Sequence, residues 1–204
     1  MKSKIQIVLI ALFLLVVPFT MQAASNYKSC KVYLFNGESF ECTGYVGNGY
    51  LEYRIDPNDK PQKILASKVK FVVSVVNDTT VIINSGFPYV PLNNSLKGDY
   101  KKTKTGRWLN FVTNPFENKV SIFKVYLYSE YKGYFPIYGL YRQGDEYGVL
   151  MYMHTDDEFR KRAPFYLTDC PEILEYIKTS KAKIKSIKDL EGVIEEYNKC
   201  LESK

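Results

Sequence analysis

The residues best suited to chemistry in this sequence are two cysteines near its end. Cys170 precedes Pro171 at a predicted helix start, and Cys200 closes the last predicted helix. A thiol at a helix N-terminus has a lowered pKa and could act as a nucleophile. A nucleophile needs a base, however, and the single histidine, His154, falls on a separate predicted element. The sequence therefore favours a structural disulfide between Cys170 and Cys200 over a catalytic thiol.

The other two cysteines flank a predicted β-hairpin with an Asn-Gly turn. A two-residue hairpin loop would set the apolar residues of the two strands on opposite faces of the sheet. A loop one residue longer, with Gly37 in a bulge position, sets Val32 opposite Phe40 and unites the apolar face. The same register sets Cys30 opposite Cys42. An even number of cysteines in an exported chain favours pairing, so we predict a second disulfide between these two.

Carboxylates are the remaining candidates for catalysis. A pair of acids acting on glycosides leaves no local motif, so an exported hydrolase is the alternative function. Its candidate acids are Asp145, Glu146, Asp156 and Asp157. Asp156 and Asp157 equally suit the start of a helix, where the helix dipole favours acidic side chains. The chain has no phosphate-binding loop, no dinucleotide-binding glycine pattern and no nucleophile-elbow motif.

One histidine does not favour a conventional zinc site. We therefore predict a protein that is not an enzyme, with no catalytic residue, no metal site and no cofactor.

Basic residues cluster between two predicted β-regions. They are Lys97, Lys101, Lys102, Lys104 and Arg107. Such a run suits either a solvated loop or a site for an anionic polysaccharide, a phosphate or a lipid head group. The formal net charge of the whole chain, +6, is mild and does not argue for nucleic acid.

Tyrosines are dense in the segment that follows. Tyrosines on a strand face can stack on sugars or form a protein interface, and they can also form the half-buried face of an antiparallel sheet. The residues concerned are Tyr126, Tyr128, Tyr131, Tyr134, Tyr138, Tyr141, Tyr147 and Tyr152.

The first 25 residues have the features of a secretory signal peptide. Two lysines precede an apolar run over residues 5–19, and the small residues Ala23 and Ser25 suit cleavage after Ser25. The run is shorter than the ~20 residues of a spanning helix, which argues against an uncleaved anchor. No second long apolar run follows. We expect an exported chain with no transmembrane segment, in the periplasm, at the cell surface or outside the cell.

The elements that position these residues are predicted from the apolar pattern of the sequence. That pattern predicts an α+β fold that is mostly antiparallel β. Short alternating strands with frequent turns over 26–84 predict a small β-barrel. Residues 85–119, rich in Gly, Pro and Asn, predict a long connection and a domain boundary. Residues 120–153 predict a second antiparallel β segment, with a hairpin turn at "RQGDEYG".

The apolar period changes to a helical one over 154–204. Thr155 and Glu158 predict a capping box for a short helix that Pro164 should limit. Asp169 with Glu172 predicts the cap of the next helix.

The last two helices are predicted to form an antiparallel hairpin. Ser186 with Asp189 predicts the cap of the second one. A short connection makes such helices pack antiparallel, so the start of the first lies beside the end of the second. Those are the positions of Cys170 and Cys200.

Two segments resemble a type of uncharacterised secreted protein found in Bacteroidota. "KVYLFNGESFECTGYV…KILASKVKFV" resembles the start of these proteins, in which a strand, a glycine turn and a second strand begin an SH3-like small barrel. "FYLTDCPEIL…VIEEYNKC" resembles their C-terminal signature, an Asp-Cys-Pro helix start followed by Tyr-Asn-x-Cys. The resemblance implies an exported, disulfide-containing protein and implies no activity.

Taken together, these patterns predict a non-enzymatic exported protein that binds a protein or glycan partner. Its expected contact surface is the tyrosine-rich segment.

Overall fold

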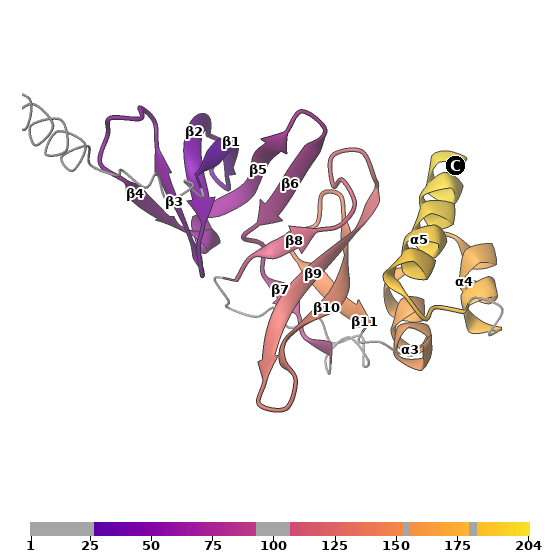
Figure 1. The fold of residues 1–204 in the computed structure, drawn as a ribbon. Coiled ribbons are helices and arrows are strands. Elements are labelled where there is room, and N and C mark those ends of the chain that lie inside the picture. The colour runs from indigo at the N-terminus through magenta and orange to yellow at the C-terminus, as the bar shows by residue number, and fades with distance from the viewer. Residues whose placement is uncertain (1–26, 93–106, 153–155, 180–182) are drawn as a thin grey trace, which may run out of the picture.

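The computed structural model describes residues 27–92, 107–152, 156–179 and 183–204. The fold is α+β, as predicted: an 11-stranded, mostly antiparallel sheet precedes a group of C-terminal helices (Figure 1). The strands run in the spatial order β4-β3-β2-β1-β5-β6-β8-β9-β10-β11-β7. The pairing of β11 with β7 is parallel, and the others are antiparallel.

The N-terminal part of the sheet follows the alternation of the sequence. Its strands are β1 (Lys28–Leu34), β2 (Ser39–Val46), β3 (Tyr50–Arg54), β4 (Gln62–Leu65), β5 (Val69–Asn77) and β6 (Thr80–Ser85). The predicted hairpin register is confirmed, because Val32 pairs with Phe40 and Cys30 with Cys42. Gly37 lies in the turn with a φ of 91°, a conformation that favours glycine.

The second part of the sheet continues without a break from the first. Its strands are β7 (Tyr89–Val90), β8 (Leu109–Phe111), β9 (Val120–Ser129), β10 (Gly133–Arg142) and β11 (Gly148–Tyr152). Residues 85–119, predicted as a connection, contribute β7 and β8 to it. Strand β8 pairs with β6 on one side and with β9 on the other, so it joins the two β-regions in one sheet.

The two faces of the sheet carry different cores. One face is aromatic, and its buried side chains include Phe71, Phe87, Leu109, Phe123, Ile137 and Tyr141. The other face bears two apolar groups. Within the N-terminal strands the group includes Val32, Leu51, Val72 and Trp108. Under the helices it includes Ile122, Leu140, Phe159, Leu190 and Tyr197.

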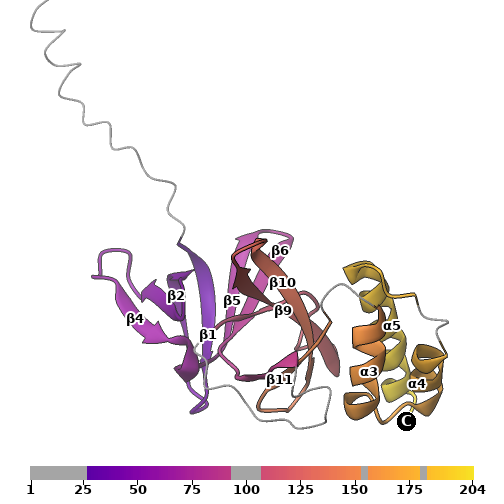
Figure 2. The ribbon, with the colours of Figure 1, turned by 90° about the horizontal axis from the view of Figure 1, so that it is seen from below.

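The helices pack at the β9–β11 end of the sheet (Figures 1 and 2). They are α3 (Asp156–Tyr166), α4 (Pro171–Lys178) and α5 (Ile187–Glu202). The capping box of Ser186 and Asp189 at the start of α5 is confirmed. Thr155, predicted to cap α3, lies outside the described residues.

Two predictions about the helices are wrong. Pro164 lies inside α3 rather than limiting it, and the helix ends two residues later. Pro164 has no N–H to donate to the carbonyl four residues before it, and the helix continues only to Tyr166. Asp169 does not cap α4: the N-cap is Cys170, and it makes no side-chain cap bond. The Asp169 carboxylate instead accepts hydrogen bonds from the Arg142 guanidinium and the Tyr197 hydroxyl.

Candidate functional site

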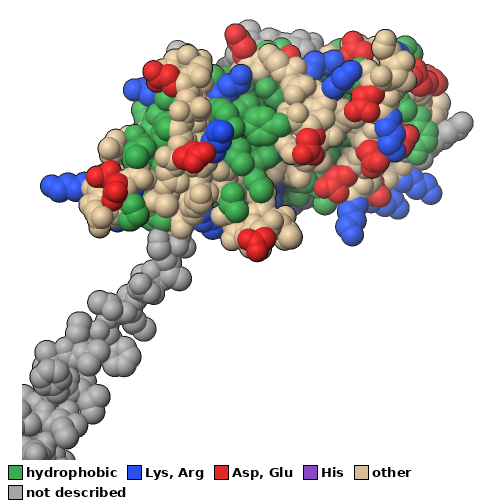
Figure 3. All heavy atoms as spheres, turned by 90° about the horizontal axis from the view of Figure 1, so that it is seen from above, with side chains coloured by type: hydrophobic (Ala, Val, Ile, Leu, Met, Phe, Trp, Pro, Cys, Tyr) green, Lys and Arg blue, Asp and Glu red, His purple; other side chains and the backbone are tan. Residues whose placement is uncertain are grey.

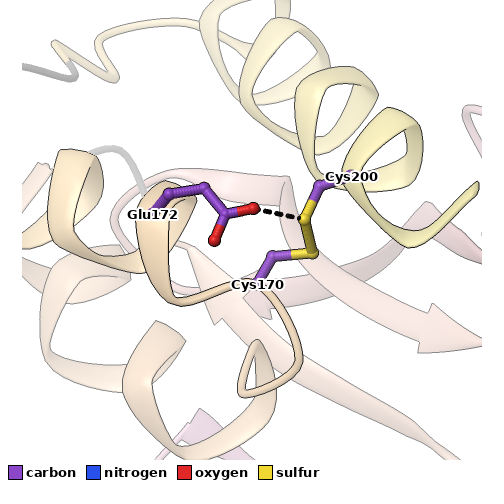
Figure 4. Close-up of side chains that lie close together, drawn as sticks. All are labelled: Cys170, Glu172 and Cys200. Carbon is purple, nitrogen blue, oxygen red and sulfur yellow. Dashed lines mark hydrogen bonds between the residues drawn. A yellow bond between two sulfur atoms is a disulfide. The ribbon is translucent and has the colours of Figure 1, made fainter. Parts of the chain in front are cut away.

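The predicted bond between Cys170 and Cys200 is present and closes the helical hairpin (Figure 4). It joins the start of α4 to the last turn of α5, with the two Cα atoms 6.3 Å apart. The carboxylate oxygen Oε1 of Glu172 lies 2.7 Å from Cys200 Sγ. Because a disulfide sulfur carries no proton, the two atoms are in close contact without an ordinary thiol hydrogen bond.

The same three side chains offer ligand atoms within 4.8 Å of one another, a spacing that suits a metal ion. Both sulfurs are used by the S–S bond, however, and a metal needs thiolates. The disulfide therefore makes this cluster structural.

Cys30 and Cys42 lie opposite each other as buried free thiols. The Leu34 N–H donates to Glu38 O, which makes Leu34 and Glu38 a hydrogen-bonded pair of the β1–β2 ladder. Such pairs recur at every second position of an antiparallel ladder, so Cys30 and Cys42 form one as well. The Cα atoms of a hydrogen-bonded pair are typically about 5.5 Å apart. That spacing lies within the range a disulfide spans. The predicted bond between them stays a prediction.

The Cys42 thiol lowers the pKa of Cys30 to about 6 by hydrogen bonding, while burial opposes the shift. The same contact raises the pKa of Cys42. Cys30 Sγ also lies 3.2 Å from Ser74 Oγ, which lines a surface cavity described below.

The four candidate acids do not share a cavity among the residues described here. Asp145 Oδ2 accepts a hydrogen bond from the Tyr166 hydroxyl, at 3.0 Å. Asp156 forms an ion pair with Arg160, at 3.3 Å. His154, the single histidine and the base that a catalytic Cys170 would need, lies outside the described residues.

The predicted tyrosine segment divides into an exposed and a buried half. On the β9–β10 hairpin the exposed fractions are 47% for Tyr126, 65% for Tyr128, 97% for Tyr131 and 75% for Tyr134. Tyr141 and Tyr152 are buried in the cores. The contact surface expected from the sequence is therefore limited to the outer half of this hairpin.

One cavity is lined by three of these tyrosines, and a second cavity shares one lining residue with it, Asn110. The first, of about 430 Å³, is lined by Gly47, Asn48, Arg107, Trp108, Asn110, Val125, Tyr126, Tyr128 and Tyr134. The second, of about 340 Å³, is lined by Lys28, Gly44, Tyr45, Val46, Ser74, Ile82, Asn84 and Asn110. We call the two together the aromatic groove. Each has the volume typical of a ligand site.

The floor of the aromatic groove is a row of polar side chains set by strand register. Asn84 on β6 pairs with Asn110 on β8, which pairs in turn with Lys124 on β9. Residues paired across neighbouring strands share one face of a sheet. The row therefore runs across the middle of a face that is apolar on both sides, between the N-terminal core and the core under the helices.

Asn84 is the most unusual member of this row. It is 4% exposed, yet its side-chain amide makes no hydrogen bond to any described residue. The amide of Asn110 makes only a long bond of 3.4 Å, to Trp108 O. Buried polar groups are nearly always hydrogen-bonded. Because Asn84 lines a cavity, its amide is open to that cavity, where water or a ligand can bond it.

No protein-family model, curated protein or solved structure matches this chain. The resemblance of its two ends to secreted Bacteroidota proteins thus stays a prediction, and any argument on function depends on the groove itself.

A hydrogen bond across the groove fixes its far wall. The Trp108 indole N–H donates to Gly47 O, at 2.9 Å, which ties the β2–β3 turn to the residue just before β8. An added Cβ at Gly47 would lie 2.8 Å from the far end of the Tyr50 ring, which would have to shift. The single tryptophan of the chain is therefore a rigid part of the groove.

The charge of the aromatic groove is positive. Its described lining includes Lys28 and Arg107 and no carboxylate. Lys124 lies at the side of the groove, with Nζ 5.6 Å from the centre of the Tyr126 ring. None of these three cations makes an ion pair with a described residue.

Sequence reasoning found the tyrosines and one cation of this site and missed its amides. Arg107 ended the predicted basic run, whose lysines lie outside the described residues. Asn84 ended a predicted strand and Asn110 fell in the predicted connection. Only the register between β6 and β8 brings those two together, and no local pattern reveals it.

Proposed function

We propose that this chain is an exported, non-enzymatic binding protein of the periplasm or cell surface, and that it binds its ligand in the aromatic groove. The observation that carries the proposal is the amide of Asn84, which bonds to no described residue and lines one cavity of the groove, while exposed tyrosines line the other. A preformed cavity with a few convergent polar groups is the usual form of a ligand site.

The surface as a whole supports a contact role for the strands. Among the described residues, all but two of the exposed large hydrophobic side chains lie on the strand part, the exceptions being Phe165 and Tyr176. Figure 3 shows hydrophobic side chains gathered over the strands on one face, whereas charged side chains are dense over the helices. Large exposed apolar patches mark interaction sites.

Export is supported by the disulfide, since such bonds persist in oxidising compartments. The signal-peptide pattern of residues 1–25 agrees with it. No helix among the described residues is long and apolar enough to cross a bilayer.

The proposal is tested with fluorescently labelled protein on glycan and peptide arrays. We expect at least one array component to bind. Changing Asn84→Ala together with Tyr134→Ala should weaken that binding at least about tenfold, because a central aromatic anchor and a buried hydrogen bond are both lost.

Tyr131→Ala is the matched control, since Tyr131 lies on the same hairpin but does not line the groove. It should bind like the unchanged protein. Absence of binding to every component, or equal loss in the control and the double variant, would contradict the proposal.

A further inference from the structure

We propose that the ligand of the aromatic groove is an acidic oligosaccharide, whose sugar rings lie on the tyrosines and whose carboxylate or sulfate groups meet Arg107 and Lys28. This inference rests on the proposed function and adds the class of ligand.

The amides of the groove match hydroxyl groups. A sugar hydroxyl both donates and accepts hydrogen bonds, and an asparagine amide offers two donors and an acceptor. Asn48, Asn84 and Asn110 all line the groove. A ligand with hydroxyls spaced along its length would satisfy the buried amide of Asn84 whichever way that amide is turned.

The tyrosines match the faces of sugar rings. The C–H groups on one face of a pyranose carry slight positive charge, and the face of an aromatic ring is negative. Tyr128 and Tyr134 lie with ring centres 5.3 Å apart at an angle of 61°, so they offer two differently inclined surfaces. Tyr126 lies on the same strand as Tyr128, two positions before it. Asn110 lines both cavities, so an oligosaccharide that fills the two would cross that residue.

The charge of the groove selects an acidic ligand. Arg107, Lys28 and Lys124 stand at or beside it without an acidic partner among the described residues. Two cations in the lining and a third beside it, with no carboxylate in the lining, create a positive potential, which attracts anions. The fixed fork of an arginine suits a carboxylate or a sulfate in particular.

A peptide fits the groove less well. Extended peptides are held mainly by main-chain hydrogen bonds to an unpaired strand edge. Asn84 and Asn110 lie on strands that are paired on both sides at these positions. The floor therefore offers side-chain groups and no free main chain, which suits a ligand recognised through hydroxyls.

The intrinsic fluorescence of Trp108 provides a readout, since it is the only tryptophan and lines the groove. The protein is titrated with an oligogalacturonate, a heparin-derived tetrasaccharide and the neutral cellotetraose. We expect a change in emission with one of the acidic sugars and binding at least about tenfold weaker for the neutral one, as a charge-assisted contact is lost.

Arg107→Gln should weaken binding of the acidic sugar about tenfold or more and leave the neutral sugar unaffected. Lys60→Gln, on the exposed β3–β4 turn outside the groove, is the charge-matched control. Raising the salt from about 0.1 M to about 1 M shortens the Debye length from about 10 Å to about 3 Å and should weaken only the acidic sugar.

The outcomes separate the two proposals. Equal, salt-independent binding of neutral and acidic sugars would overturn the acidic ligand and leave the binding function intact. Binding of an array peptide that is lost in the Asn84 and Tyr134 double variant, with no response to any sugar, would overturn the sugar class alone. Absence of any ligand on either array would overturn both.

Discussion

Asn84 in the aromatic groove and Asn198 in α5 are two buried asparagines with opposite surroundings. They are 4% and 6% exposed. The Asn198 amide is fully used, because its Oδ1 accepts from the Val120 N–H and its Nδ2 donates to Val120 O, both at 2.8 Å. The Asn84 amide bonds to no described residue. The same side chain is thus a structural tie in one region and an open group in the other.

This difference extends to the regions around the two residues. In the helical part, polar groups tie elements together: Arg142 of β10 donates to Asp169 and to Tyr166 O, and Lys119 donates to Leu201 O. In the groove, amides and cations point at a cavity. Satisfied polar groups stabilise a fold, and unsatisfied ones in a cavity mark a place for a ligand. Under the proposed function, the helices secure the sheet and the strands carry the contact site.

The largest test of this division is removal of the disulfide. Changing Cys170→Ser together with Cys200→Ser should lower the free energy of unfolding by about 3–4 kcal/mol, because the bond closes a sequence separation of 30 residues. Urea denaturation measures the loss. Binding at the groove should persist in the folded variant. An unchanged unfolding midpoint would show that the hairpin does not need its bond.

The two asparagines give a matched comparison of intermediate size. Asn198→Ala should cost about 2–3 kcal/mol, since it leaves the main-chain groups of Val120 without partners in the core. Asn84→Ala removes no protein hydrogen bond and should change stability by less than about 1 kcal/mol, while it weakens ligand binding. Thermal and urea denaturation of both variants decide the comparison. A large loss of stability from Asn84→Ala would make its amide structural and would weaken the case for the groove.

Much of the fold could be predicted because local pattern determined it. Alternating apolar residues located most strands, the Cys30 and Cys42 register followed from keeping one apolar face, and the helical hairpin brought Cys170 to Cys200. Segment 85–119 lacked such a pattern. Strand β8 has only 3 residues, and its place in the sheet is decided by pairing with strands far along the chain.

The error at Asp169 has a physical cause that also limits prediction of the groove, which is competition from partners distant in sequence. Asp169 had the sequence of an N-cap, but the charge of Arg142 on β10 engages its carboxylate. In the bond to Arg142 both partners are charged, whereas at a helix N–H only the carboxylate would be. For the same reason the groove could be predicted only in part: its tyrosines belong to one hairpin, whereas its amides meet through long-range register.

The smallest test concerns this tie between Asp169 and Arg142. The hydrogen bond from Arg142 lowers the pKa of Asp169, with burial opposing and Tyr197 adding to the effect. A carboxyl whose pKa is lower in the folded state than in the unfolded chain contributes stability above its unfolded pKa of about 3.9. That contribution is lost as pH falls through the folded pKa.

Asp169→Asn should therefore lose less stability than the unchanged protein between pH 5 and about pH 2, as measured by urea denaturation at each pH. Because the Asp169 side chain is 45% exposed, the difference at pH 7 should stay below about 1 kcal/mol. Asp78→Asn, on the exposed β5–β6 turn, is the control and should leave the pH dependence unchanged. If the free energy of unfolding falls with pH in parallel for Asp169→Asn and the unchanged protein, the ion pair with Arg142 does not hold the helical part to the sheet. The contrast with the groove would then depend on Asn198 and the disulfide alone.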